Sequence, residues 1–298
     1  MTTLKIENVC KQYGKLETVR GVSLQIEAGE RVALLGHNGA GKTTLMRMIL
    51  GLTPITSGVI SIKGATPGSR SARSSIGFLP ESVAFHGALT GREQLQHFAR
   101  LKSATTLRAD DLLDRVGLSD AADRKIRTYS KGMRQRIGLA QALLGHPKLA
   151  LLDEPTSGLD PVSRHEFYDI VEELSAAGTA VLLSSHALTE LETRTDRIAI
   201  MSKGKLLADN SLAALRQTAR LPIHVNVTTS EADADRIATE LGGERVNGRS
   251  VILTCQQDHK VAMLGQITAL GAAIKDVDVT PAGLEDLYRY YSNVGEGA

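Results

Sequence analysis

The stretch GHNGAGKT, from Gly36 to Thr43, constrains the fold of this chain more than any other feature. It follows RVALL, which reads as a buried strand, and it leads into KTTLMRMIL, which reads as a helix. Glycines allow backbone N–H groups to close around phosphate oxygens, and the start of a helix adds a partial positive charge. This order predicts a phosphate-binding loop, because the alternative, a chance glycine-rich turn, would not require both flanking elements.

Two side chains of this loop carry the chemistry expected of it. Lys42 should reach the β and γ phosphates of a nucleotide, and the hydroxyl of Thr43 should bind Mg²⁺. The residues that we expect around the phosphates are Gly36, Asn38, Gly39, Ala40, Gly41, Lys42, Thr43 and Thr44.

The pattern of apolar residues predicts an α/β fold. The runs LALLD from Leu149 and AVLLSS from Ala180 are continuously apolar, as expected for parallel strands covered on both faces. Short β patterns separated by glycine-containing turns fill the region from residue 4 to 62. Between about residues 86 and 145 the pattern becomes helical, and Thr90 with Glu93 forms a capping box. We therefore expect a parallel sheet with a helical insert.

A second, smaller domain is expected after residue 217. The segments IHVNVTT, EADADRIATEL, VILTC, HKVAMLGQITAL and IKDVDVT alternate strand and helix. With a short strand near Glu244 to Val246, this order predicts an α+β domain of the ferredoxin-like type. Thr280 and Pro281 are expected to cap and open a final helix. The predicted domains are 1–217 and 218–298.

Charge and cysteine content exclude several classes of function. The net charge of +2 gives no global attraction to nucleic acid or acidic lipid. Cys10 and Cys255 lack the spacing of a disulfide pair or a metal site, so we expect two small buried side chains. No apolar run reaches the roughly 18 residues that a membrane-spanning helix needs. Any membrane role is therefore expected to come through a partner.

Two carboxylates follow the strand LALLD. Asp153 and Glu154 leave it at the sheet edge where α/β folds bind their ligands. Alone, such a pair is usually just solvated. Beside a phosphate loop, Asp153 is expected to face the metal and Glu154 to act as the base that deprotonates water. His186 ends the strand AVLLSS and could donate to the γ-phosphate or hold the water, although a lone histidine is more often structural.

A second helix start with phosphate-binding character lies at YSKGMRQR, Tyr129 to Arg136. Ser130 can cap this helix, and its hydroxyl, the N–H near Gly132 and the helix dipole would all face an anion. The alternative is that Ser130 only caps the helix. The basic residues around it could also suggest nucleic acid, but Tyr129 is the only aromatic residue that could stack on a base.

The motifs GHNGAGKTT, YSKGMRQR, LLDEPTSGLD and Ser185-His186, in that order, resemble the nucleotide-binding subunit of ATP-binding cassette (ABC) transporters over about residues 2–217. The resemblance implies a P-loop NTPase fold with a RecA-like parallel-sheet core, an antiparallel β subdomain and a helical subdomain. It implies ATP hydrolysis with ATP and Mg²⁺ bound.

The resemblance also implies partners. In the family, YSKGMRQR corresponds to the signature motif. Two copies of the chain would pair head to tail, with the signature motif of one closing over the ATP on the phosphate loop of the other. Each helix start then serves a different nucleotide. An integral membrane permease would be the further partner, which implies a cytoplasmic protein bound peripherally to the inner face of the cell membrane.

Three further residues take their expected roles from the resemblance. Tyr13 matches the aromatic that stacks on adenine, although an exposed tyrosine at a strand end is the alternative. Glu81 stands where the family usually has glutamine, next to the metal and the transporter contact. Asp160, with the preceding glycine and leucine, matches the loop that crosses the dimer interface. Lys131 and Met133 depart from the glycine and glutamine usual in the signature.

Glu81 and the segment TPAGLEDLY resemble the branch of the family that serves exporter-type permeases. Within it the chain is similar to the ATPases of NosDFY-type complexes, which help assemble the copper sites of bacterial nitrous oxide reductase. That likeness implies a periplasmic cargo-handling protein as a further partner, and the chain itself is expected to bind no copper. The alternative function is a soluble cassette ATPase acting on nucleic acid or ribosomes. It is disfavoured by the single phosphate loop and the lack of a long coiled-coil insert.

Overall fold

The computed structural model describes residues 1–102, 108–185 and 188–296. Contacts divide the chain into two compact units, Met1–Asn210 and Ser211–Ala298. The boundary expected after residue 217 falls inside helix α8 (Leu212–Ala219). The structure groups this helix with the second unit, where the Tyr291 hydroxyl donates to the carbonyl of Leu215 at 3.2 Å.

A six-stranded sheet forms the centre of the first unit, in the order β5-β6-β7-β3-β8-β9. Its neighbours pair in parallel except β8 with β9. Every residue of β6 and β7 is buried, which confirms the reading of their continuously apolar sequences. The strands are β3 (Arg31–Leu35), β5 (Ile76–Leu79), β6 (Leu149–Asp153), β7 (Ala180–Ser184), β8 (Arg197–Ser202) and β9 (Lys205–Asn210).

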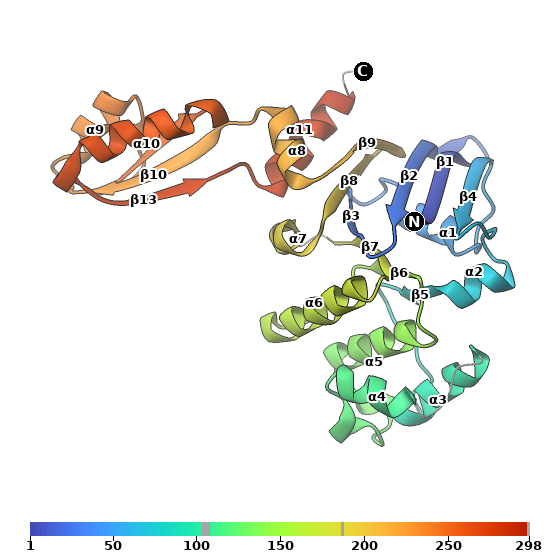
Figure 1. Cartoon of the computed structure of the whole chain (residues 1–298). Helices are drawn as coiled ribbons and strands as arrows, with labels where there is room; N and C mark the ends of the chain where they lie inside the picture. Colours follow the sequence, from blue (N-terminus) through green and yellow to red (C-terminus); the bar gives the residue numbers. More distant parts are fainter. Residues whose placement is uncertain (103–107, 186–187, 297–298) are drawn as a thin grey trace. The chain divides into compact units, whose positions relative to one another are not determined.

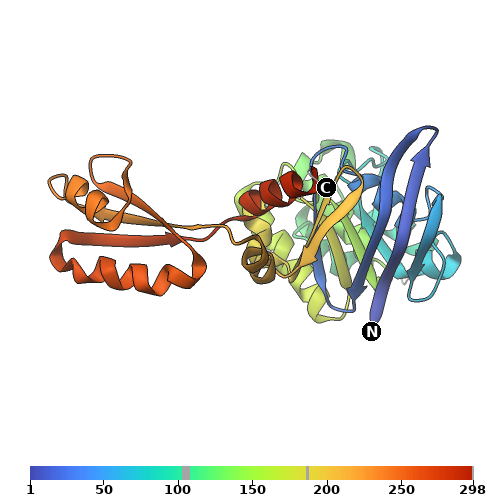
Figure 2. The ribbon, with the colours of Figure 1, turned by 90° about the horizontal axis from the view of Figure 1, so that it is seen from above.

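A three-stranded antiparallel sheet, in the order β2-β1-β4, forms the second layer of this unit. Figure 2 shows β1 and β2 (blue) as a long hairpin. Helix α1 packs Leu45, Met46 and Ile49 into the same apolar cluster as the buried faces of both sheets. The elements are β1 (Thr2–Tyr13), β2 (Leu16–Glu27), α1 (Lys42–Ile49) and β4 (Ser57–Ile62).

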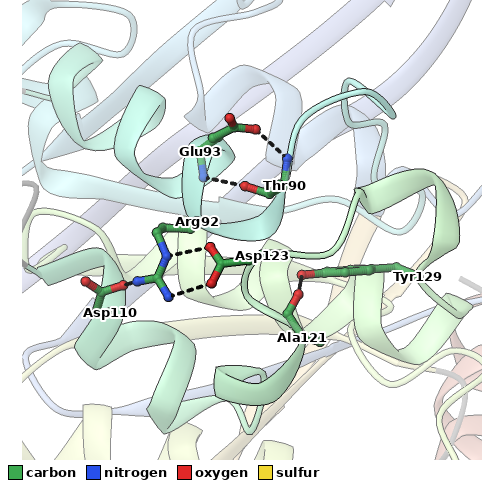
Figure 3. A network of polar contacts seen from close by, with 7 residues as sticks. All are labelled: Thr90, Arg92, Glu93, Asp110, Ala121, Asp123 and Tyr129. Atoms are coloured by element: carbon green, nitrogen blue, oxygen red, sulfur yellow. Dashed lines mark hydrogen bonds and ion pairs between the residues drawn. The ribbon is translucent and has the colours of Figure 1, made fainter.

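Helices α3, α4 and α5 lie together, as Figure 1 shows in green, in the segment expected to be a helical insert. The predicted capping box is present: Thr90 Oγ1 accepts from the Glu93 N–H at 3.2 Å, and the Glu93 carboxylate accepts from the Thr90 N–H at 2.8 Å (Figure 3). Arg92 pairs with Asp123 at 2.8 Å and with Asp110. The helices of this unit are α2 (Arg70–Ser75), α3 (Gly91–Leu101), α4 (Arg108–Arg115), α5 (Lys131–Leu143), α6 (Pro161–Ala176) and α7 (Leu188–Arg194).

The second unit contains the expected ferredoxin-like fold. Its sheet has the order β11-β12-β10-β13 with all pairs antiparallel, and its elements follow the sequence βαββαβ. Apolar residues of α9 and α10 pack on one face of this sheet. The elements are β10 (Ile223–Thr229), α9 (Ala234–Leu241), β11 (Glu244–Arg245), β12 (Ser250–Cys255), α10 (Lys260–Ala269), β13 (Ile274–Thr280) and α11 (Leu284–Glu296).

The expected start of the last helix is wrong. Thr280 is the final residue of β13, where it pairs with His224 of β10, and α11 begins only at Leu284. The N–H of Gly283 donates to the Asp286 carboxylate at 3.1 Å, so the cap lies closer to the helix than the sequence suggested. None of the described helices is long and apolar enough to cross a membrane.

Candidate nucleotide site

The phosphate loop lies between β3 and α1, as its sequence predicts. Gly41 immediately precedes α1 and has a φ of 105°, a conformation that residues with a Cβ rarely adopt. A Cβ there would lie 2.8 Å from the Thr18 carbonyl oxygen, and one on Gly36 would lie 2.7 Å from the Met201 carbonyl oxygen. The glycines therefore let the loop backbone lie directly against β2 and β8.

Lys42 folds back over this loop. Its ammonium donates to the Gly36 carbonyl at 2.5 Å and to the His37 carbonyl at 3.3 Å, and the residue is only 8% exposed. Burial lowers the pKa of Lys42, while the negative charges of Glu154, Asp153 and Glu81 oppose that shift. The ammonium is thus held at the loop, within the field of three carboxylates.

The remaining loop residues differ in exposure. Asn38, Gly39 and Thr43 are exposed, Gly36, Gly41 and Thr44 are half-buried, and Ala40 is buried. Thr43 is therefore an exposed residue in the first turn of α1.

The carboxyl ends of β3, β5, β6 and β7 meet at one edge of the sheet, because these strands are parallel neighbours. Asp153 ends β6 and is paired in register with Ser184 of β7. The Ser184 hydroxyl donates to Asp153 Oδ1 at 2.6 Å and accepts from the Glu154 N–H at 3.0 Å. One buried hydroxyl thus orients the side chain of Asp153 and the backbone of Glu154.

Glu154 adopts a φ of 48°, in the left-handed region that costs a non-glycine residue free energy. Its N–H also contacts the Ser184 carbonyl at 3.2 Å. Strain of this kind is often found at functional sites.

Ser184 was not anticipated as a site residue, although a hydroxyl at the end of an otherwise apolar strand was the available signal.

The donor set at this edge fits Mg²⁺. The ion prefers hard oxygen ligands and is usually held by one or two protein groups together with phosphates and water. The Asp153 carboxylate and the Thr43 hydroxyl are such ligands. Among the residues that the structure describes, no three His, Cys, Asp or Glu side chains form a site that would hold a metal on their own.

Glu81 and Tyr13 follow from the family resemblance as further site residues, and the strands nearest to them in the chain, β5 and β1, belong to different sheets. Glu81 is exposed, two residues beyond the end of β5, and contributes to the field at Lys42. Tyr13 is the last residue of β1 and is 46% exposed. The Lys11 ammonium lies 4.6 Å from the centre of its ring, a cation–π contact.

Ser130 caps α5, as expected. Its Oγ accepts from the Met133 N–H at 3.2 Å, and the residue is exposed. Tyr129 is only 3% exposed, and its hydroxyl donates to the Ala121 carbonyl at 2.7 Å (Figure 3). This ring is therefore not available to stack on a nucleic-acid base, which removes the aromatic support for that alternative.

Asp160 caps α6. Its carboxylate accepts from the Val162 N–H at 3.1 Å and from the Ser163 N–H at 3.0 Å, and the Ser163 hydroxyl donates to it at 2.5 Å. These hydrogen bonds, that of the Ser163 hydroxyl first, lower the pKa of Asp160. His186 lies outside the described residues.

The two helix starts occupy different parts of the first unit. Figure 1 shows α1 and α5 well apart, α1 beside the antiparallel strands and α5 among the green helices. The structure thus brings Lys42, Asp153, Glu154 and Glu81 into one electrostatic environment, and it places Ser130 on a separate element.

Comparisons with known proteins agree with this geometry. The family model described as ABC transporter matches residues 19–157. The ABC transporter ATP-binding protein YdbJ of Bacillus subtilis (strain 168) is 43% identical over 219 residues, which cover 72% of this chain and 71% of YdbJ. The linearmycin resistance ATP-binding protein LnrL of the same organism is 39% identical over 211 residues, 69% of this chain and 68% of LnrL.

A solved structure extends the similarity to the fold. It is the dimeric, post-hydrolysis state of the ATP-binding cassette MJ0796 bound to ADP and Pi. The TM-score is 0.65 at 25% sequence identity, and the match covers 70% of this chain and 98% of that one.

Proposed function

The chain belongs to the ATP-binding proteins of ABC transporters, and from this premise we propose that it is the motor subunit that couples ATP hydrolysis to the movement of a separate membrane permease. The chain is accordingly an ATPase. We assign the nucleotide chemistry to the first unit and an accessory, regulatory role to the second.

The observation that carries this proposal is the sheet edge where the Lys42 ammonium, Asp153 and Glu154 meet. Lys42 already donates to loop carbonyls, so a phosphate would replace these acceptors with a charged one. Thr43 and Asp153 would hold Mg²⁺, which neutralises phosphate charge when bound. Glu154, fixed through its backbone by Ser184, would take the proton of the attacking water.

The separation of the two helix starts supports the pairing of two copies. Ser130 precedes α5, whereas the phosphate loop precedes α1, so the two helix starts belong to separate elements of one chain. In the proposed head-to-tail pair, Ser130 of each chain donates to the nucleotide held by the partner's loop. The related cassette MJ0796 is dimeric in its post-hydrolysis state with ADP and Pi, which supports a paired form of this chain.

We assign the permease contact to residues 78–91, which run from the end of β5 to the start of α3 and include Glu81. Such a segment could receive a short helix of a membrane protein and transmit closure of the pair as a mechanical movement. This role locates the protein on the inner face of the cell membrane. Recovery of a permease from detergent-solubilised membranes supports it, whereas recovery of ribosomes or DNA favours the soluble alternative.

The most specific part of the proposal concerns what the transporter serves. Similarity to the ATPases that serve nitrous oxide reductase suggests support of copper-site assembly, with a periplasmic cargo-handling protein as a further partner. The name of LnrL connects that relative with resistance to linearmycin. The alternative is therefore that the permease exports a small molecule. Mass spectrometry of the proteins that copurify with the permease distinguishes the two.

Glu154→Gln tests the proposed chemistry. The amide keeps the size of the side chain but cannot accept the proton, so turnover should fall about 10²- to 10⁴-fold. MgATP binding should remain, and the paired form should accumulate in light-scattering measurements. Glu172→Gln, which changes an exposed carboxylate on α6, is the matched control and should leave turnover unchanged. Undiminished hydrolysis in Glu154→Gln would remove this residue from the role of base.

A further inference from the structure

Lys131, the residue after Ser130, lies across a loop of its own chain. Its ammonium donates to the Ser157 hydroxyl at 3.4 Å. A Cβ built on Gly158 would lie 2.7 Å from Lys131 Nζ, 2.8 Å from its Cδ and 2.9 Å from its Cε, so the outer part of the lysine side chain covers this glycine. Gly158 has a φ of 78° and leaves the space that the lysine fills.

The contact includes the next residue of the turn. A Cβ on Gly132 would lie 3.4 Å from Cδ2 of Leu159, which is itself only 3% exposed. Later in α5, Arg136 donates to the Ser163 hydroxyl at 2.8 Å, and that hydroxyl donates to Asp160. The start of α5 and the segment leading into α6 therefore form one packed junction.

This junction is connected to the candidate base. The loop begins at Glu154, whose carbonyl accepts from the Ser157 N–H at 3.2 Å, and it continues through the Leu159 N–H, which donates to the Thr156 carbonyl at 3.1 Å. A single hydrogen-bonded turn thus separates Glu154 from the residue that Lys131 contacts. A movement of this turn would therefore displace Lys131 and the adjacent Ser130.

We propose that Lys131 is a positioning residue that links the Ser130 turn to the Ser157–Gly158 loop of the same chain, and so couples the two nucleotides of the pair. The inference rests on the proposed function, in which Glu154 acts on one nucleotide and Ser130 on the other. Lys131 transmits the position of the loop after Glu154 to the serine that reaches the partner's phosphate. A glycine at position 131 would lack the side chain that makes this link.

A double-mutant cycle on the purified full chain tests the link. Lys131→Met keeps most of the aliphatic stem and removes the ammonium, and Ser157→Ala removes its acceptor. Each single change should lower the turnover number at saturating MgATP by about 2- to 30-fold, the range typical of residues along a coupling network. Because both remove one interaction, the double variant should be no slower than the slower single variant. Binding of MgATP at low protein concentration should stay unchanged in all three.

Two outcomes would overturn the inference. Multiplicative losses in the double variant would mean that Lys131 acts without Ser157, for example by touching phosphate itself. Unchanged turnover in Lys131→Met would mean that it has no role. Lys131→Arg should recover part of the rate, and thermal unfolding of each variant shows whether it is folded. Ser130→Ala in the same assay separates the two proposals: full activity there contradicts the proposed pairing as well, whereas loss there with normal Lys131 variants contradicts only the link.

Discussion

The two helix starts of the first unit are built differently, and the difference indicates how each would treat an anion. Helix α1 follows Gly41 in a left-handed conformation, and among the described residues no side chain caps its first N–H groups. Helix α5 follows Ser130, whose hydroxyl oxygen already accepts from the Met133 N–H. The first start offers backbone N–H groups that no described side chain caps, and the second offers one oriented hydroxyl.

This comparison explains why only one of them needs a buried lysine. An open backbone cradle surrounds a phosphate and concentrates negative charge, which Lys42 and the helix dipole neutralise. A capped serine has its O–H hydrogen still available, because the cap uses only an acceptor lone pair. It can add a single directed hydrogen bond to a phosphate that another element already holds. The α1 start thus suits primary binding, and the α5 start suits completion of a shared site.

The largest expected effect separates the two starts directly. Lys42→Ala should abolish MgATP binding by the chain at low concentration, because it removes the charge at the loop. Ser130→Ala should leave that binding intact and lower turnover about 10²-fold, as expected for one lost donor to a developing charge. Equilibrium titration with a fluorescent ATP analogue, beside steady-state turnover, checks both. Equal loss of binding in the two variants would contradict the division of roles.

Capping and phosphate contact at Ser130 are distinguished by a control. Alanine at a helix cap costs about 1 kcal/mol of stability, whereas glycine costs only a few tenths. Ser130→Gly should therefore unfold close to the wild-type temperature, yet it should lose turnover as fully as Ser130→Ala. If turnover instead follows stability in the two variants, Ser130 only caps the helix.

A smaller effect is expected from the residue that orients the carboxylates. Ser184→Ala leaves the buried Asp153 Oδ1 and the Glu154 N–H without this partner, a change that should cost about 1–3 kcal/mol of unfolding free energy. Turnover should also fall, since Asp153 and Glu154 lose their fixed geometry. Ser175→Ala, which loses a hydrogen bond of 2.6 Å to the Gly29 carbonyl, should destabilise the fold and keep turnover per folded molecule. Urea unfolding and activity at matched concentration check both; an unaltered rate in Ser184→Ala contradicts its orienting role.

Most of the fold could be predicted from local sequence patterns. Features that depend on contacts between distant segments could not. The loop before Lys42, the apolar strands and the Thr90 capping box depend on neighbouring residues, so their patterns predicted them. Thr280 looked like a helix cap, but pairing of β13 with β10 outweighed that local preference. The expected boundary after residue 217 differs from the structural division after residue 210 because of a contact between distant segments. Helix α8 contacts α11 and therefore belongs to the second unit.

The site shows the same division. Sequence order placed Lys42, Asp153 and Glu154 at one sheet edge, because parallel strands bring their carboxyl ends together. The bridging role of Ser184 requires the register of β6 with β7, which no local pattern specifies. The contact of Lys131 with Ser157 joins residues separated by 26 positions and follows only from the packing of α5 on the loop.

The smallest expected effect concerns Lys102, a half-buried lysine, which contrasts with Lys42. Lys102 donates to the carbonyls of Ile76 at 3.3 Å and Leu144 at 3.1 Å, and burial lowers its pKa from the ordinary value of 10.5. The folded chain therefore binds fewer protons than the unfolded chain between the lowered and the ordinary pKa, so the unfolding free energy should rise with pH across that window. Lys102→Met should show a smaller rise, because only the contribution of Lys42, whose pKa burial also lowers, then remains of the two. Lys148→Met, which changes an exposed lysine, should retain the full rise. Urea unfolding from neutral pH to the ordinary lysine pKa measures the slopes, and parallel curves for wild type and Lys102→Met would contradict the assignment. A positive result would show that burial alone opposes the charge of Lys102, whereas at Lys42 three nearby carboxylates offset part of the same effect.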